Sequence, residues 1–204
     1  MTTEPISSRR ADTRRNRERI LAAAERALAE SGEISFNAIA KAAGVGVGTI
    51  YRHFPTSEAL VLAVYQAEVR NLIEIVPTLL DSHPPQEAFR VWVTDHLAHY
   101  MATKRGLGDA LRAAATGGEV YNRAYEEVTV ALAALVRANV EAGTVRADLD
   151  PRTVMRGLGG LLLLDPAGDQ GAQIADLTDL LWRGMRATPR TSEGPEDPSD
   201  PKTS

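Results

Sequence analysis

Apolar residues recur every three or four positions through most of the chain, and polar residues fill the positions between them. In the first such stretch, Ile20, Ala24, Ala27 and Leu28 form one stripe. This spacing places apolar side chains on one face of an α-helix. Repeated along the chain, it predicts about nine helices, at residues 12–31, 36–43, 47–53, 57–76, 85–103, 107–116, 119–142, 151–164 and 170–187. We therefore expect an all-α fold.

Glycine and proline set several of the predicted helix ends. Gly32, Gly44 and Gly143 each follow a periodic stretch, where a helix needs a residue in the left-handed conformation. Pro55 stops the third helix, because proline cannot continue the backbone hydrogen-bond ladder. For the same reason, we expect the fourth helix to end near Pro77.

Residues 36–53 form two short helices joined by a glycine turn, which is the arrangement of a helix-turn-helix. Ser35 is a suitable N-cap for the first of them, and Thr56 or Ser57 for the helix that follows. The second short helix carries a polar set of Thr49, Tyr51, Arg52 and His53. In a helix-turn-helix this second helix enters the DNA major groove.

Two other interpretations of this stretch are open. Gly44, Gly46 and Gly48 have a superficial likeness to a dinucleotide-binding glycine loop, but that loop follows a β-strand, and an alanine-rich helix precedes these glycines. The second alternative is a helix pair that packs for stability alone. It leaves the polar set on the second helix without a role.

The segment A-G-V-G-V-G-T-I-Y-R-H-F-P-T-S-E-A-L resembles the DNA-binding signature of the TetR family of transcriptional regulators. Residues 101–107 also resemble a C-terminal domain of some actinobacterial members. The resemblance implies a three-helix DNA-binding domain followed by a helical ligand-binding and dimerisation domain. It implies DNA contacts by these residues: Lys41, Gly48, Thr49, Tyr51, Arg52 and His53. Gly46 and Ser57 depart from the family pattern. Because these changes would weaken contacts with the DNA backbone, we expect the N-terminal arginines to contribute more to DNA binding.

The charge is unevenly distributed along the chain. The net charge is −4, but residues 1–54 carry +3 and residues 55–204 carry −7. The basic segment includes Arg14 and Arg15, which we expect to contact phosphates, and residues 1–11 are expected to be disordered. The alternative is a flexible tail that is merely basic. A basic N-terminal segment on an acidic body fits a DNA-binding protein with a separate effector domain.

Aromatic residues with polar tips occupy the apolar faces of the helices at 85–103 and 119–142. They suit a pocket for a small, largely apolar ligand, although plain core packing is the stronger alternative for such stripes. The candidate lining residues are Trp92, His96, Tyr100, Tyr121 and Tyr125. His96 and His99 lie three residues apart beside Asp95, but without a third ligand in view we expect no metal site.

The last two predicted helices are more apolar than one subunit can cover. Four leucines at 161–164 surround the helix on every side. By resemblance to the family, helices 151–164 and 170–187 would form a four-helix bundle with the same pair from a second subunit. Residues 188–204 are rich in proline and charge, and we expect them to be disordered.

The sequence contains no cysteine, no catalytic motif, no signal peptide and no apolar run of membrane-spanning length. We therefore expect a cytoplasmic protein that is not an enzyme and needs no cofactor. An all-α enzyme or carrier, and a purely architectural DNA-binding protein, are the rival interpretations. The prediction is a homodimeric TetR-type repressor that a small ligand releases from a pseudo-palindromic operator. Its domains would span 1–54 (DNA-binding, with the basic arm), 55–187 (ligand-binding and dimerisation) and 188–204 (tail).

Overall fold

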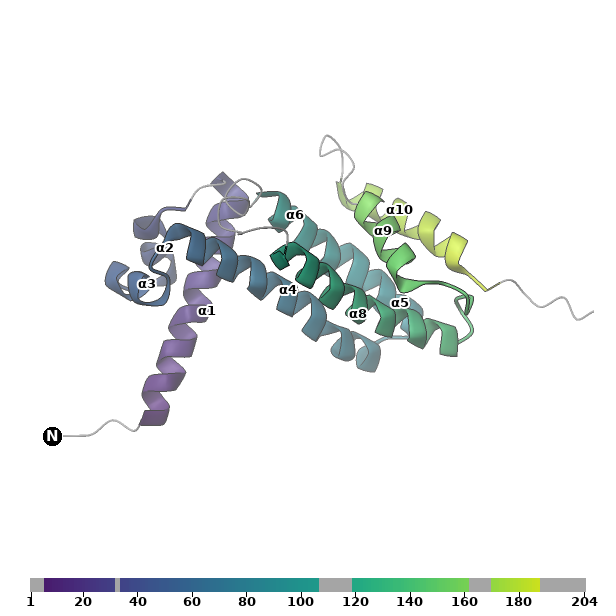
Figure 1. Cartoon of the computed structure of the whole chain (residues 1–204), viewed down its shortest axis with the longest axis horizontal. Coiled ribbons are helices and arrows are strands. Elements are labelled where there is room, and N and C mark those ends of the chain that lie inside the picture. Colours follow the sequence, from purple (N-terminus) through teal and green to yellow (C-terminus); the bar gives the residue numbers. More distant parts are fainter. Residues whose placement is uncertain (1–5, 32–33, 107–118, 162–169, 188–204) are drawn as a thin grey trace, which may run out of the picture.

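The computed structural model describes residues 6–31, 34–106, 119–161 and 170–187, and these residues are almost entirely helical (Figure 1). They contain no strand beyond an isolated bridge between Val145 and Arg186. The predicted all-α fold is confirmed. The helix expected at 107–116 lies outside the described residues, as does the tail at 188–204.

Three helices form the N-terminal unit: α1 (Ile6–Ser31), α2 (Phe36–Ala43) and α3 (Val47–His53). In Figure 1, α2 and α3 lie together at one end of the molecule beside α1. The helices meet through apolar side chains that are almost completely buried, as the sequence pattern predicts. These side chains are Ile20, Ala24, Leu28, Ile39, Ala40, Ala43, Ile50 and Phe54.

The first helix begins earlier than predicted. We expected disorder over residues 1–11, whereas α1 starts at Ile6. Between Ile6 and the predicted start at Asp12 there is no glycine or proline to interrupt a helix, and the arginines there are good helix formers. Residues 6–11 are therefore helical.

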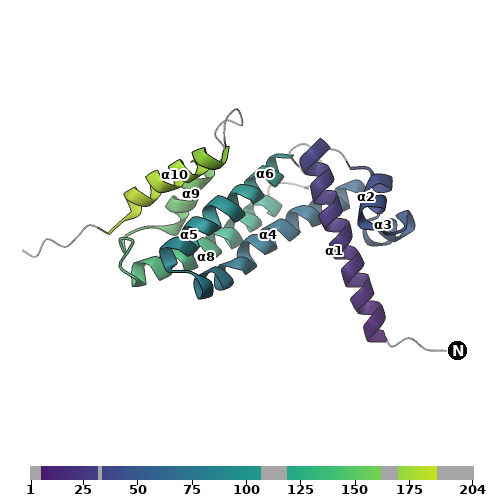
Figure 2. The same ribbon diagram turned by 180° about the vertical axis from the view of Figure 1, so that it is seen from behind.

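Helix α4 (Ser57–Ser82) runs from the N-terminal unit along the whole body (Figures 1 and 2). The predicted end near Pro77 is wrong, because the helix continues for five residues beyond it. Pro77 itself is exposed, whereas Leu79 is buried and Leu80 is half-buried in the core. Burial of this last turn outweighs the hydrogen bond that the proline removes.

The body is built around α4, α8 (Glu119–Glu141) and a rod made of three joined segments. The rod comprises α5 (Pro85–Val91), a π-helical stretch η1 (Trp92–Leu97) and α6 (Ala98–Gly106). The rod includes residues 85–103, for which the sequence predicted one helix. Helix α4 packs against α8 and against every segment of the rod, so that one continuous core joins them.

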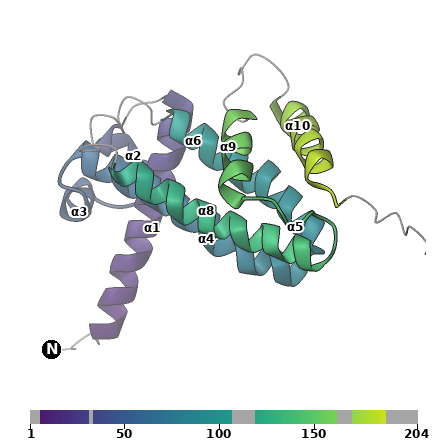
Figure 3. The same ribbon diagram turned by 45° about the vertical axis from the view of Figure 1, so that its right-hand side comes forward.

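Helices α9 (Pro151–Leu161) and α10 (Gln170–Met185) pack on one another and close one side of the body (Figure 3). Asp150 caps α9 by accepting hydrogen bonds from the backbone N–H groups of Arg152 and Thr153, both at 3.1 Å. A hydrogen bond from the Thr153 hydroxyl to Asp150, together with these backbone bonds, holds the pKa of Asp150 below its usual value. No helix in the described parts of the chain is long and apolar enough to cross a membrane.

Candidate nucleic-acid interface

The turn between α2 and α3 has a backbone conformation that favours glycine. Gly44 lies in the left-handed region, with φ at 61°. The Ser35 side chain caps the start of α2 by accepting a hydrogen bond from the N–H of Ala38 at 3.4 Å. Both predictions, the N-cap and the left-handed glycine, are confirmed. They fix the angle at which α3 leaves α2.

An arginine of α1 holds this turn from outside. Arg19 Nη2 donates a hydrogen bond to the carbonyl oxygen of Gly44 at 3.1 Å. A Cβ atom at Gly44 would lie 2.6 Å from the same nitrogen. The sequence pattern did not identify this role of Arg19, because Gly44 follows it by 25 residues and no local pattern links them.

Helix α3 buries one side and exposes the other. Ile50 is fully buried, and Phe54 at the end of the helix is 3% exposed. The predicted DNA-contacting residues lie at the surface: Tyr51 is 55% exposed, Gly48 and Arg52 are exposed, and Thr49 and His53 are half-buried. A Cβ atom at Gly48 would meet no atom within 4 Å. The structure therefore brings the five predicted residues together on one accessible helix.

Tyr51 is supported by an aromatic partner that the sequence pattern did not identify. Its ring meets the ring of Phe36 edge-on, with the centroids 4.9 Å apart and the planes at 66°. Phe36 is the first residue of α2 and is half-buried. An edge-to-face contact of this kind restricts the Tyr51 side chain and stabilises its outward direction.

The remaining predicted DNA-contacting residues lie on the two preceding helices. Lys41 is exposed on α2. Arg14 and Arg15 are exposed on α1, where Arg14 Nε lies 3.7 Å from Glu18 and Arg15 pairs with Asp12. Exposed ion pairs of this kind are weak, so both guanidinium groups remain accessible to phosphates.

The candidate ligand residues do not share one cavity. Trp92 is fully buried, and its indole nitrogen donates a hydrogen bond to the Leu72 carbonyl at 2.9 Å. This placement favours the alternative of core packing for Trp92. His96 is half-buried, and Tyr125 is 36% exposed on α8.

Tyr100 and Tyr121 converge on Tyr65, a residue of α4 that sequence reasoning did not single out. The hydroxyl groups of Tyr65 and Tyr100 lie 3.0 Å apart, and the rings of Tyr65 and Tyr121 have centroids 5.8 Å apart. Burial raises the pKa of both Tyr65 and Tyr100, so both phenols stay neutral. The ammonium group of Lys104 lies over the ring of Tyr121, with Nζ 5.3 Å from the ring centroid.

An open pocket of about 460 Å³ adjoins this tyrosine cluster between α4 and α8. Its apolar wall and its charged rim come from these residues: Tyr65, Gln66, Val69, Arg70, Val120, Arg123, Ala124 and Glu127. A second open pocket, of about 420 Å³, lies at the far end of the body beside Arg90, Asp179 and Arg186. The pocket between α4 and α8 is the one that borders α4, the helix that follows α3.

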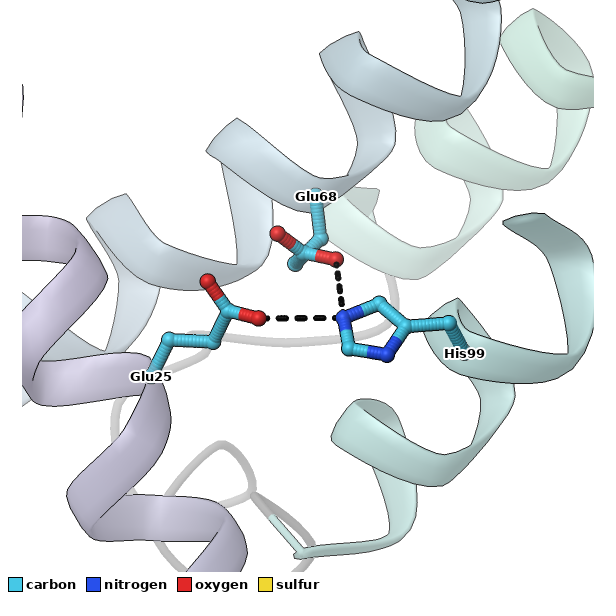
Figure 4. Close-up of side chains that lie close together, drawn as sticks. All are labelled: Glu25, Glu68 and His99. Carbon is cyan, nitrogen blue, oxygen red and sulfur yellow. Dashed lines mark hydrogen bonds and ion pairs between the residues drawn. The ribbon is translucent and has the colours of Figure 1, made fainter. Parts of the chain in front are cut away.

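His99 has different neighbours from those considered in the sequence. Its Nε2 atom faces Glu25 of α1 and Glu68 of α4 (Figure 4). Asp95 instead accepts a hydrogen bond from Thr94. Burial, followed by the nearby Glu25, raises the pKa of Glu68.

Comparisons with known proteins agree with this arrangement. Residues 20–64 match the model of the bacterial regulatory proteins of the tetR family, and residues 84–187 match the C-terminal domain of SbtR-like transcriptional regulators. These two matches coincide with the helix-turn-helix and with most of the body.

Solved structures resemble the chain over most of its length. A TetR transcriptional regulator from Streptomyces coelicolor is 43% identical, with a TM-score of 0.77, over 84% of this chain and 99% of that one. A TetR regulator from Mycobacterium vanbaalenii is 34% identical, with a TM-score of 0.72, over 87% and 99%.

A curated relative, an HTH-type transcriptional regulator of Staphylococcus aureus, is 31% identical over 57% of this chain. The match spans 64% of the length of that relative. The family models, the similar structures and the geometry of α2 and α3 lead to one conclusion: the chain belongs to the TetR family of bacterial transcriptional regulators.

Proposed function

We propose that this protein is a ligand-responsive repressor that binds a pseudo-palindromic operator as a homodimer. The observation that carries the proposal is the exposed polar face of α3, held at a fixed angle by the Gly44 turn. Such a helix suits the major groove, where side chains reach base edges. The protein would act in the cytoplasm, with the chromosome, and would not be an enzyme.

On the DNA, α3 would supply the sequence-reading contacts. Thr49, Tyr51 and His53 would face base edges or phosphates, with Arg52 as a further partner. Gly48 would allow close approach of the DNA to the helix backbone, since it has no side chain and the space where a Cβ atom would lie is open. Lys41, Arg14 and Arg15 would contact phosphates and contribute affinity that falls with salt.

The dimer would form through α9 and α10. Leu180 is 65% exposed on α10, and its neighbours Ile174, Leu177 and Leu181 are only half-buried within the chain. The opposite side of α10 is already anchored, because the Trp182 ring packs on Phe89 with centroids 5.2 Å apart. A helix with one face bound and a large apolar side chain, Leu180, exposed on the opposite face suits a symmetric interface. The domain boundaries would remain at 1–54 and 55–187, with a tail at 188–204.

The ligand would occupy the pocket between α4 and α8, beside Tyr65, Tyr100 and Tyr121. His96, Tyr125 and Trp92 do not line this pocket, so the ligand would not need them for contact. A ligand shifts the protein only if it prefers one conformation. Because α4 borders the pocket and begins four residues after α3 ends, displacement of α4 would change the spacing of the two α3 helices in the dimer.

A gel-shift assay with the DNA flanking the protein's own gene tests this function. We expect a discrete retarded complex that competitor DNA of unrelated sequence does not remove. An enzyme or a carrier would give no retarded band, and a purely architectural protein would give a band that unrelated DNA competes away. Either of these results would overturn the proposal.

A further inference from the structure

Three potential metal ligands converge where the N-terminal unit meets the body. Glu25 comes from α1, Glu68 from α4 and His99 from α6 (Figure 4). His99 Nε2 lies 3.0 Å from Glu25 Oε1 and 3.5 Å from Glu68 Oε2. One donor atom from each of the three residues lies within 4.8 Å of the other two.

We propose that Glu25, Glu68 and His99 form a binding site for a divalent transition-metal ion, best suited to Zn²⁺, that fastens α1 to α4 and α6. Its three residues are separate from the exposed residues of α3 and from the lining of the pocket between α4 and α8. It goes beyond the proposed function and does not depend on it.

The spacing of the donor atoms fits a metal ion. Zinc binds imidazole nitrogen and carboxylate oxygen at about 2.0–2.2 Å, so two ligands of a tetrahedral site lie about 3.3–3.6 Å apart. The distances from His99 Nε2 to the two carboxylates, 3.0 and 3.5 Å, need only small adjustments to reach this range, and the two carboxylate oxygens lie within 4.8 Å of each other. One nitrogen, Nε2, faces both carboxylates, as a lone pair aimed at an ion between them would require (Figure 4).

The charges of the cluster also favour a cation. The Glu68 side chain is only 8% exposed and the Glu25 side chain 28%, so two carboxylates face each other with limited access to water. A single imidazole carries at most one positive charge, whereas a divalent ion neutralises both carboxylates. Buried like charges are costly unless they are paired or coordinate a metal. Asn71 Nδ2, 3.5 Å from Glu68 Oε1, supports the free oxygen of the buried carboxylate.

The ligand types select the class of ion. Mg²⁺ and Ca²⁺ prefer oxygen ligands throughout, whereas imidazole suits Zn²⁺ and its transition-metal neighbours. Three protein ligands leave a fourth position of a tetrahedral ion open for water. The His99 side chain is 58% exposed, so an ion can reach the site from solvent.

The ion would join segments that belong to different units. Glu25 lies in the segment that matches the tetR-family model, and His99 lies in the segment that matches the SbtR-like C-terminal domain. Glu68 lies between them on α4. Occupancy would therefore restrict the movement of α1 relative to the body.

Metal binding can be measured directly on the untagged full chain after treatment with a chelator. Titration with Co²⁺, followed by its visible absorption, and with Zn²⁺, followed by calorimetry, should give one ion per chain and a higher melting temperature. Glu25→Gln, Glu68→Gln and His99→Gln should each weaken binding by about 10-fold or more, as loss of one of three ligands implies. Glu74→Gln, exposed on α4, and His83→Gln, at the end of α4, are matched controls that should bind as the parent does.

A gain of signal separates a metal site from a simple ion pair. The chain has no cysteine, so His99→Cys introduces its sole thiol. Bound Co²⁺ should then show a sulfur-to-cobalt charge-transfer band that the parent lacks, even if other variants fold poorly. The proposal is overturned if the parent binds no ion, if the three variants bind as tightly as the controls, or if Co²⁺ binds to His99→Cys without the band.

Discussion

At the scale of single residues, the proposed DNA-binding face depends on a few side chains that local sequence identifies only in part. The exposed residues of α3 follow from the helical period, since Ile50 and Phe54 define the buried side. Their supports do not. Phe36 meets Tyr51 from the helix before, and Arg19 reaches Gly44 from α1. Neither contact has a periodic signature, because each depends on how two helices cross.

Replacement of Tyr51 tests the α3 surface. Tyr51→Ala should weaken operator binding by about 1–3 kcal/mol, because we propose that Tyr51 contacts the DNA from α3. Since Tyr51 is 55% exposed, the melting temperature should change little. Fluorescence anisotropy with labelled operator DNA measures the affinity. Arg137→Ala, an exposed change on α8, is the control, and parental affinity in Tyr51→Ala would remove α3 from the interface.

The turn between α2 and α3 allows a matched glycine experiment. Gly44 and Gly143 both have positive φ, at 61° and 70°. An alanine at either position strains the backbone, by about 1–2 kcal/mol. At Gly44 the new Cβ would also lie 2.6 Å from Arg19 Nη2, so the guanidinium must move away and lose its hydrogen bond to the Gly44 carbonyl, whereas at Gly143 nothing lies within 4 Å. Gly44→Ala should therefore lower the free energy of unfolding more than Gly143→Ala does, and should also weaken DNA binding.

Urea denaturation gives both free energies of unfolding. The double variant Arg19→Ala, Gly44→Ala should be about as stable as Gly44→Ala, because the hydrogen bond from Arg19 is already lost in the single variant and the backbone strain is the same. Equal losses at Gly44 and Gly143 would show that Arg19 does not constrain the turn.

At the scale of helices, the sequence predicts caps and apolar faces well and the extent of helices less well. Ser35, Gly44 and Thr56 are local signals, and each has its predicted role. The end of α4 was missed because burial of Leu79 outweighs the effect of Pro77, and burial depends on the whole body. The cluster around His99 was missed for a related reason, since Glu25 precedes it by 74 residues and lies on another helix.

The proline inside α4 should lower stability. Pro77→Ala restores a backbone N–H in the helix interior and removes the clash of the ring with the preceding turn. Part of this gain is offset by the greater freedom of the unfolded chain, so we expect stabilisation of about 1–2 kcal/mol. Pro85→Ala is the matched control, because a proline at the first turn of α5 removes no helical hydrogen bond. Urea denaturation should show a clear gain for Pro77→Ala and little change for Pro85→Ala; the reverse order would contradict this account.

At the scale of the whole molecule, α4 connects the helix that we propose binds the operator with the pocket that we propose binds the ligand. It begins four residues after α3 ends, borders the pocket beside Tyr65 and carries Glu68. A ligand at the pocket and an ion at Glu68 would thus act on the same helix. A coupling of about 1–3 kcal/mol between ligand and operator would change operator affinity roughly 5–150-fold. The apolar composition of the last two helices predicts the dimer that we propose, but the sequence does not show which side of α10 is open. The exposure of Leu180 becomes apparent only when Trp182, on the other side of α10, is seen to be buried.

Leu180 offers the most direct test of that assembly. It is 65% exposed, so Leu180→Asp should leave the fold of one chain intact. In a symmetric dimer, each substitution would bury an unpaired charge close to its twofold mate, and such a charge costs several kcal/mol. Sedimentation velocity should show a monomer for Leu180→Asp and a dimer for the parent. Val130→Asp introduces the same charge at a 71%-exposed position on α8 and serves as the control.

The same variant links assembly to DNA binding. A dimer places its two α3 helices on half-sites about 34–36 Å apart, or at a multiple of that spacing, and the two contacts reinforce each other. Leu180→Asp should therefore bind a full operator about as weakly as the parent binds a single half-site, while its melting curve remains cooperative. A dimeric Leu180→Asp would place the interface elsewhere than on this face of α10. A monomeric variant that kept full operator affinity would show instead that one chain suffices to recognise the DNA.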